Sequence, residues 1–176
     1  MSEEPQPSRF KPRKVGPPTP KDLGRIDRAV VWVATVGGLG RVPVVGGALA
    51  AVAAIPLWFV MSFLPLAAYA GILGLLLGLG VACAGRFDRL HQTRDDPRIV
   101  VDELVGVLLL MLAGARTVGS VAAGLILFGI LDILKPPPLN LIDRHVRGGL
   151  GVMGDDLAAG AVGGALLWVM RWLGLV

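Results

Sequence analysis

The sequence has little charge, few aromatic side chains and almost no cysteine. Charged residues make up 17% of its 176 positions, hydrophobic residues 54% and aromatic residues 6%. A soluble domain usually carries about 25% charged residues, so this shortage of charge points to a membrane protein. The single cysteine, Cys83, excludes an intrachain disulfide. Because no stretch interleaves basic with aromatic residues, we expect no nucleic-acid partner despite the net charge of +4.

Several catalytic signatures are also absent. The chain has no Asp-x-Asp pair of an aspartyl-phosphate phosphatase and no glycine-rich loop ending in Lys-Ser or Lys-Thr. Cys83 and Arg89 have the spacing of cysteine phosphatases, but Cys83 ends an apolar run, which favours a buried structural cysteine. Gly149, Gly151 and Gly154 match the G-x-G-x-x-G dinucleotide pattern. No strand precedes them, so we reject a dinucleotide site.

Long uncharged runs are what the sequence has instead. Residues 44–64 and 66–84 carry no charge over 21 and 19 positions. About 20 apolar residues cross a hydrocarbon core roughly 30 Å thick, so both runs are predicted to span a membrane, with Pro65 at the hinge. A buried hairpin of a soluble protein is the alternative. The small-xxx-small spacing of closely packed helices occurs twice, at Gly74/Gly78 and Gly160/Gly164.

The N-terminal segment lacks the layout of a secretory signal peptide. Residues 1–28 hold six prolines and seven basic residues, and the first apolar stretch begins only at Ala29. Such a segment buries too little apolar surface to offset its ordering entropy. We therefore expect a disordered tail followed by one domain over residues 29–176. The basic charge of the tail and loops is expected to face the cytoplasm and to contact anionic lipid head groups.

Acidic residues outside this tail fall in two short stretches and never within the apolar runs. The nine are Asp88, Asp95, Asp96, Asp102 and Glu103 in the first stretch, and Asp132, Asp143, Asp155 and Asp156 in the second. Solvated loops and helix capping are the simplest explanations. Capping explains one acid per helix better than two. It does not explain Asp132, which lies near a helix C-terminus where the dipole disfavours an acid.

Whether the two acidic stretches meet depends on the chain between them. A single helix over 104–131 would run about 42 Å and bury Arg116 at a cost of roughly 2.5–3.5 kcal/mol. A turn within 113–120 would instead make a hairpin of 104–113 and 120–134 and place both acidic stretches on one side. We predict the hairpin, with the arginine-rich loops marking the acidic side as cytoplasmic.

Carboxylates gathered at helix ends favour a hard cation such as Mg²⁺, which prefers oxygen ligands and substrate phosphates. The basic side chains of Lys135, Arg144 and Arg147 are candidates to bind a phosphate. Free N–H groups at the helix start that follows Gly148 and Gly149 are candidates for the same task. The pattern indicates a metal-assisted site for a phosphorylated lipid at the cytoplasmic surface.

Several spaced motifs occur in order in "DDPRIVVDELVG" at 95–106 and "LDILKPPPLNLIDRHVRGGLGVMGDDLAAG" at 131–160. Together they resemble the phosphatidylglycerophosphatase A family. The resemblance implies removal of the phosphate from phosphatidylglycerophosphate, which gives phosphatidylglycerol, at the bacterial inner membrane with Mg²⁺ as cofactor. Carried onto matching positions, it implies the site residues Asp96, Asp102, Glu103, Asp132, Lys135, Asp143, Asp155 and Asp156.

Roles within this set follow from chemistry alone. We expect Asp102, Glu103, Asp132 and Asp156 to hold the metal and Lys135 to face the phosphate. Water is the expected nucleophile, and a covalent route is the alternative.

The segment 37–48 departs from the family pattern. Val44 and Val45 stand where the family has Gly-Thr, and Ala48 stands where it has Ser. If the lost hydroxyls contact substrate, substrate choice or activity would change. Arg41 in the same segment is a candidate to compensate.

The sequence thus predicts an all-α fold, a compact integral-membrane bundle of about five or six helices. We expect it to cross the bacterial inner membrane several times with its site facing the cytoplasm. The predicted function is that of a Mg²⁺-dependent phosphatase acting on phosphatidylglycerophosphate. Alternatives are a phosphatase of another lipid or isoprenoid phosphate, and a non-catalytic membrane protein with a divalent-cation site. The expected partners are the lipid substrate and membrane lipid, and no pattern sets the oligomeric state.

Overall fold

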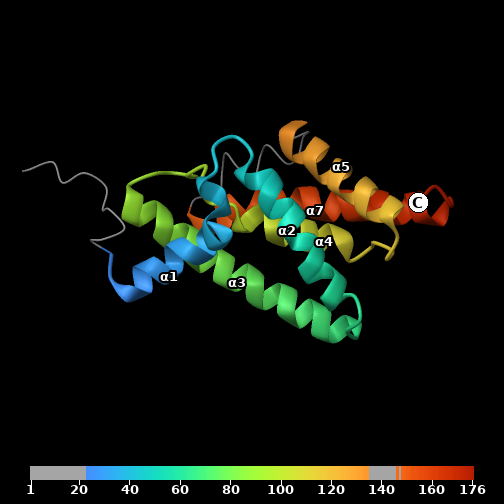
Figure 1. Cartoon of the computed structure of the whole chain (residues 1–176), viewed down its shortest axis with the longest axis horizontal. Helices are drawn as coiled ribbons and strands as arrows, with labels where there is room; N and C mark the ends of the chain where they lie inside the picture. Colours follow the sequence, from blue (N-terminus) through green and yellow to red (C-terminus); the bar gives the residue numbers. More distant parts are fainter. Residues whose placement is uncertain (1–22, 135–145, 147) are drawn as a thin grey trace, which may run out of the picture.

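Helices account for all regular structure in the described part of the chain. The computed structural model describes residues 23–134, 146 and 148–176. Within them lie α1 (Arg25–Ala34), the 3₁₀ helix η1 (Val36–Arg41), α2 (Gly46–Met61), α3 (Leu66–His91), α4 (Val101–Met111), α5 (Val118–Leu134) and α7 (Gly149–Trp172) (Figure 1). The all-α class is confirmed, and these seven elements exceed the expected five or six. Residues 25–28, which we assigned to the tail, belong to α1, whereas residues 1–22 lie outside the described part.

The short helix α4 forms the centre of the bundle. It contacts α2, α3, α5 and α7 (Figure 1), and Val105, Leu108 and Leu110 are fully buried. Its C-terminal carbonyl groups lack partners within the helix, as at any helix end. Two side chains satisfy such groups: the indole of Trp58 donates to the Met111 carbonyl at 2.7 Å and the hydroxyl of Tyr69 donates to that of Leu108 at 2.6 Å.

Glycines let α7 lie close against α4. A Cβ atom on Gly160 would overlap the carbonyl oxygen of Gly106, and one on Gly164 would lie 3.2 Å from the carbonyl oxygen of Leu110. The predicted packing role of this pair is therefore confirmed. The same prediction for Gly74 and Gly78 is wrong within the described residues, because a Cβ atom there would meet nothing within 4 Å.

The connection between α4 and α5 is the predicted hairpin. The helix α4 ends at Met111 and α5 begins at Val118, so the single-helix alternative is wrong. Arg116 lies in the turn and not inside an apolar helix. It donates two hydrogen bonds to Ser62, to Oγ at 3.0 Å and to the carbonyl oxygen at 2.6 Å, and stacks on the ring of Phe63. The turns after α2 and α4 therefore lie at the same end of the bundle.

Two described helices, α3 and α7, are long and apolar enough to cross a membrane. In the most apolar stretch of α3 only 17% of the residues are buried inside the protein, against 56% in α7. The predicted hinge is confirmed, since Pro65 caps the start of α3. The predicted span over 44–64 is too long, because α2 covers only Gly46–Met61, 16 residues.

Candidate active site

The loop after α3 is organised by a buried carboxylate. Gln92 has φ 55° and ends the helix in the left-handed conformation. The side chain of Asp88 then accepts hydrogen bonds from the Thr93 hydroxyl at 3.0 Å, the Asp95 N–H at 2.9 Å and the Asp96 N–H at 3.2 Å. Asp88 therefore shapes the loop that leads to α4, as a capping acid would, and does not line the cavity described below.

Asp96 follows in this loop and pairs with Arg98. The guanidinium donates to both carboxylate oxygens of Asp96 at 2.8 Å and lies over the ring of Phe87. Hydrogen bonds from Arg98 hold the pKa of Asp96 below its usual value, and the carboxylate in turn raises the pKa of Arg98. The predicted site residue Asp96 is thus buried and lines the cavity as half of an ion pair with Arg98, which also lines it.

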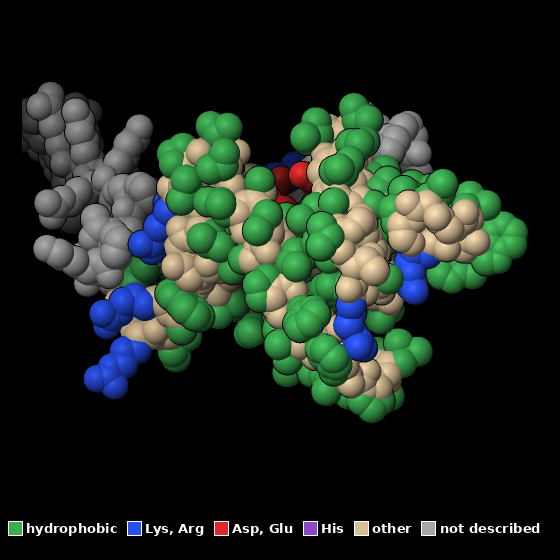
Figure 2. Space-filling model, turned by 45° about the vertical axis from the view of Figure 1, so that its right-hand side comes forward, with side chains coloured by type: hydrophobic (Ala, Val, Ile, Leu, Met, Phe, Trp, Pro, Cys, Tyr) green, Lys and Arg blue, Asp and Glu red, His purple; other side chains and the backbone are tan. Residues whose placement is uncertain are grey.

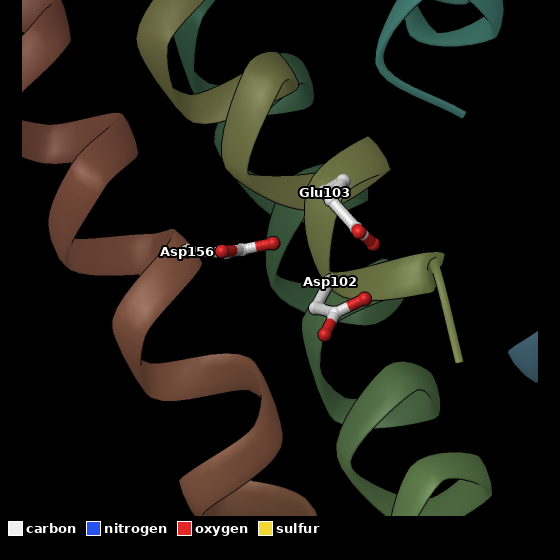
Figure 3. A group of neighbouring side chains, drawn as sticks. All are labelled: Asp102, Glu103 and Asp156. Atoms are coloured by element: carbon white, nitrogen blue, oxygen red, sulfur yellow. The ribbon is translucent and has the colours of Figure 1, made fainter. Parts of the chain in front are cut away.

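Three carboxylates converge where α4 begins. The first turn of α4 carries Asp102 and Glu103, and Asp156 projects toward it from α7 (Figure 3). One oxygen from each lies within 4.8 Å of the others. The oxygens Asp102 Oδ1 and Glu103 Oε2 are buried and have no hydrogen-bond partner among the described residues. Burial raises the pKa of Asp102 and of Glu103. The neighbouring acids Glu103 and Asp156 raise the pKa of Asp102 further, whereas the side chain of Asp102 partly offsets the rise at Glu103.

Asp132 and Asp155 border this cluster. Asp132, in the last turn of α5, is half-buried, and Asp155 is buried in α7. Both charges contribute to the raised pKa of Glu103. The two acidic stretches therefore meet on one side of the bundle, as the hairpin prediction requires.

Small residues make this convergence sterically feasible. A Cβ atom on Gly47, near the start of α2, would overlap Oε1 of Glu103. A Cβ atom on Gly106 would lie 2.7 Å from the backbone oxygen of Asp156. Both positions are glycine in the sequence, which allows α2 and α7 to reach the acids of α4.

A cavity of about 900 Å³ opens above the carboxylates. Its walls come from the segment 40–52, from the loop before α4, from one face of α5 and from Asp155 and Asp156. Figure 2 shows acidic side chains at the bottom of a hollow between two largely apolar lobes. Such an arrangement can hold a cation and a phosphate at its base and an apolar group along its walls.

Six further residues were predicted for the site, four of them outside the described part of the chain. Lys135, Asp143, Arg144 and Arg147 fall outside the described residues. Gly148 and Gly149 do not line the cavity. A Cβ atom on Gly149 would overlap the carbonyl oxygen of Val81, so close packing between α7 and α3 accounts for this glycine.

Sequence reasoning missed the apolar wall that α5 contributes. Leu125, Phe128 and Gly129 line the cavity on the same side of the helix as Asp132. Helical spacing was the available signal, since residues three, four and seven positions before Asp132 share its face. Arg98 was missed as the partner of Asp96, and nothing in its spacing singled it out.

Comparison with known proteins gives the family of this chain. A sequence model described as phosphatidylglycerophosphatase A matches residues 32–171. Phosphatidylglycerophosphatase A of Escherichia coli K12 is 37% identical over 132 residues, 74% of this chain and 77% of that protein. A Bacteroides thetaiotaomicron protein, named provisionally as a phosphatidylinositol-3-phosphatase, is 34% identical over 151 residues, 81% of this chain and 94% of that protein. No solved structure matches. The chain belongs to the phosphatidylglycerophosphatase A family.

Proposed function

We propose that this protein is a Mg²⁺-dependent lipid phosphatase that hydrolyses phosphatidylglycerophosphate to phosphatidylglycerol. One observation carries the proposal: carboxylate oxygens of Asp102 and Glu103 that have no hydrogen-bond partner in the described part of the chain lie beside Asp156 at the base of an apolar-walled cavity. Buried acids without partners are costly in a folded protein, so their retention favours a bound cation. Membership of the family supplies the substrate class.

The residues present fit Mg²⁺. Asp102, Glu103 and Asp156 offer only hard oxygen ligands, the type that Mg²⁺ prefers. We propose Asp132 as a fourth ligand because it borders this cluster. When bound, the ion would offset the negative charge of the phosphate and polarise its oxygens. The carboxylates would fix where the ion sits, and through it where the phosphate binds.

Chain residues would also handle the leaving group and the phosphate. Hydrolysis would form a bond between phosphorus and the water oxygen while the bond between phosphorus and the glycerol oxygen breaks. A proton given up by the water would end on the released glycerol oxygen. Water remains the expected nucleophile, with a covalent route as the alternative. Lys135, Arg144 and Arg147 are proposed to bind the phosphate and Asp143 to complete the site, as the sequence predicted.

The proposed location is the bacterial cytoplasmic membrane, with several crossings. The largely outward-facing apolar side chains of α3 support this, because a core helix of a soluble protein would be mostly buried. Arg86, Arg89, Arg94 and Arg98 lie on or after the end of α3 that approaches the acidic cavity. By the positive-inside rule, this end faces the cytoplasm.

A phosphate-release assay on a panel of lipid phosphates tests the function. Purified protein in detergent should release phosphate from phosphatidylglycerophosphate with Mg²⁺ and not with EDTA. Asp102→Asn and Asp156→Asn should each abolish release while leaving the circular dichroism unchanged. Asp27→Asn is the control, because Asp27 pairs with Arg86 away from the cavity.

Two results would contradict the proposal. If a phosphoinositide or an isoprenoid phosphate is turned over faster, the proposed site stands and the proposed substrate is wrong. The phosphoinositide is included because of the name of the Bacteroides relative. No turnover on any lipid phosphate, with Mg²⁺ still bound, would favour the non-catalytic cation site.

A further inference from the structure

The cavity extends well beyond the carboxylates, along two helices. On α2 its lining runs from Gly46 to Val52, and on α5 it runs from Asp132 back to Leu125. At 1.5 Å per residue, the stretch is about 9 Å long on α2 and about 10–11 Å long on α5. The cavity is therefore a groove between α2 and α5, with the acids at one end. A phosphate at the acids would leave most of this length free.

The groove changes from polar to apolar along its length. Beyond the acids its walls are formed by Ala51, Val52, Leu125, Phe128 and Gly129, none of which has a polar side chain. Its rim continues into exposed apolar side chains of the same two helices. Val52 is 56% exposed, and Ile126 on α5 is 61% exposed. An apolar groove that opens onto an apolar outer surface suits a ligand arriving from lipid.

We propose that the groove between α2 and α5 holds an acyl chain of the substrate, which enters sideways from the bilayer, and that Gly129 keeps the groove open. This inference rests on the proposed function, because a cation held by the acids at the end of the groove would position the phosphate. Because the groove is continuous with the acids, one molecule that has both a phosphate and an apolar chain can fill both, and we therefore assign the groove to the lipid substrate. A soluble phosphate ester would need only the polar end.

Gly129 is the position where the groove can be closed without disturbing the fold. It lines the cavity, and a Cβ atom there would have no atom of the described residues within 4 Å. It lies three residues before Asp132, on the same face of α5. A larger side chain at this position would enter the groove and displace no protein atom around its Cβ. Leucine also favours a helix more than glycine does.

The test compares chain-length dependence in Gly129→Leu and in the intact sequence. Dioleoyl and dihexanoyl phosphatidylglycerophosphate are supplied in mixed micelles with Mg²⁺, and phosphate release is followed. The unmodified protein should have a higher kcat/KM for the dioleoyl lipid. In Gly129→Leu this value should fall roughly tenfold or more, as expected when an apolar pocket loses a good fit, while that for the dihexanoyl lipid stays unchanged.

Gly119→Leu is the matched control. Gly119 lies on the same helix and does not line the cavity, and among residues 23–134, 146 and 148–176 no atom would lie within 4 Å of its Cβ. This variant should keep the full preference for the dioleoyl lipid. Thermal unfolding and size-exclusion mass of both variants are measured alongside.

Several outcomes would overturn the groove proposal and leave the proposed function standing. These are no chain-length preference in the unmodified protein, an unchanged rate of Gly129→Leu on the dioleoyl lipid, or an equal loss on both lipids. A change in oligomeric mass without a chain-length effect would assign the groove to a second copy of the chain. Failure of the unmodified protein on both lipids would remove the proposed function, and the groove proposal with it.

Discussion

Gly47→Ala should separate activity from stability. The added Cβ overlaps Oε1 of Glu103, the far end of a flexible side chain. This oxygen has to move by about 1 Å to restore ordinary van der Waals contact, and no backbone needs to shift. A misplacement of about 1 Å at a reacting centre costs on the order of 100-fold in rate. Alanine is the better helix former at this position of α2, so the fold should lose little stability.

The assay is kcat/KM for phosphate release at saturating Mg²⁺, measured with the unfolding temperature of the same preparation. Gly74→Ala is the control, because Gly74 on α3 has open space at its Cβ position. It should leave both quantities unchanged. Wild-type kcat/KM in Gly47→Ala would refute the reasoning, since it would mean that the position of the Glu103 carboxylate has no effect on turnover. A large fall in unfolding temperature would refute the claim that the side chain alone gives way.

Three further predictions concern stability. Gly160→Ala should lower the free energy of unfolding by about 1–3 kcal/mol, because its Cβ meets the backbone oxygen of Gly106, and denaturant unfolding measures this. Saturating Mg²⁺ should raise the unfolding temperature, and Asp156→Asn should remove the increase. In EDTA, the free energy of unfolding should fall as pH rises above about 4, because burial raises the pKa of Asp102 and Glu103 in the folded state above the unfolded values. Unfolding temperatures measured over a pH series should show this fall, and Asp102→Asn should make it smaller.

Much of the architecture could be predicted because local patterns govern it. The turn before α5 followed from the cost of burying Arg116, and the break at Pro65 followed from proline geometry. The length of α2 could not be predicted, because hydropathy alone does not show where a helix stops inside an uncharged run. The prediction that Gly74 and Gly78 pack against another helix was wrong for a similar reason. A glycine spacing shows that close approach is sterically allowed, and only the fold decides whether a second helix is there.

The residues of the candidate site could also be predicted only in part. Motif spacing identified Asp102, Glu103 and Asp156, which do converge. It could not distinguish them from Asp96, which the structure pairs with Arg98, because a pattern of acids does not show which one has a cation beside it. The apolar wall around Gly129 was missed for a different reason. A glycine leaves space where another residue would have a side chain. Whether that space becomes part of a cavity depends on where the neighbouring helices lie, which the sequence does not show.

Two adjacent acids on α4 need two neighbouring helices, α2 and α7, to complete the acidic cluster. Consecutive residues on an α-helix point about 100° apart, so Asp102 and Glu103 cannot both face the same neighbouring helix. The side chain of Glu103 lies against α2, where Gly47 leaves room for it, while Asp156 approaches from α7. The cluster therefore requires α2 and α7 to flank the start of α4 together. This explains why so short a helix lies at the centre of the bundle, since only a buried α4 has neighbours on both sides of its first turn.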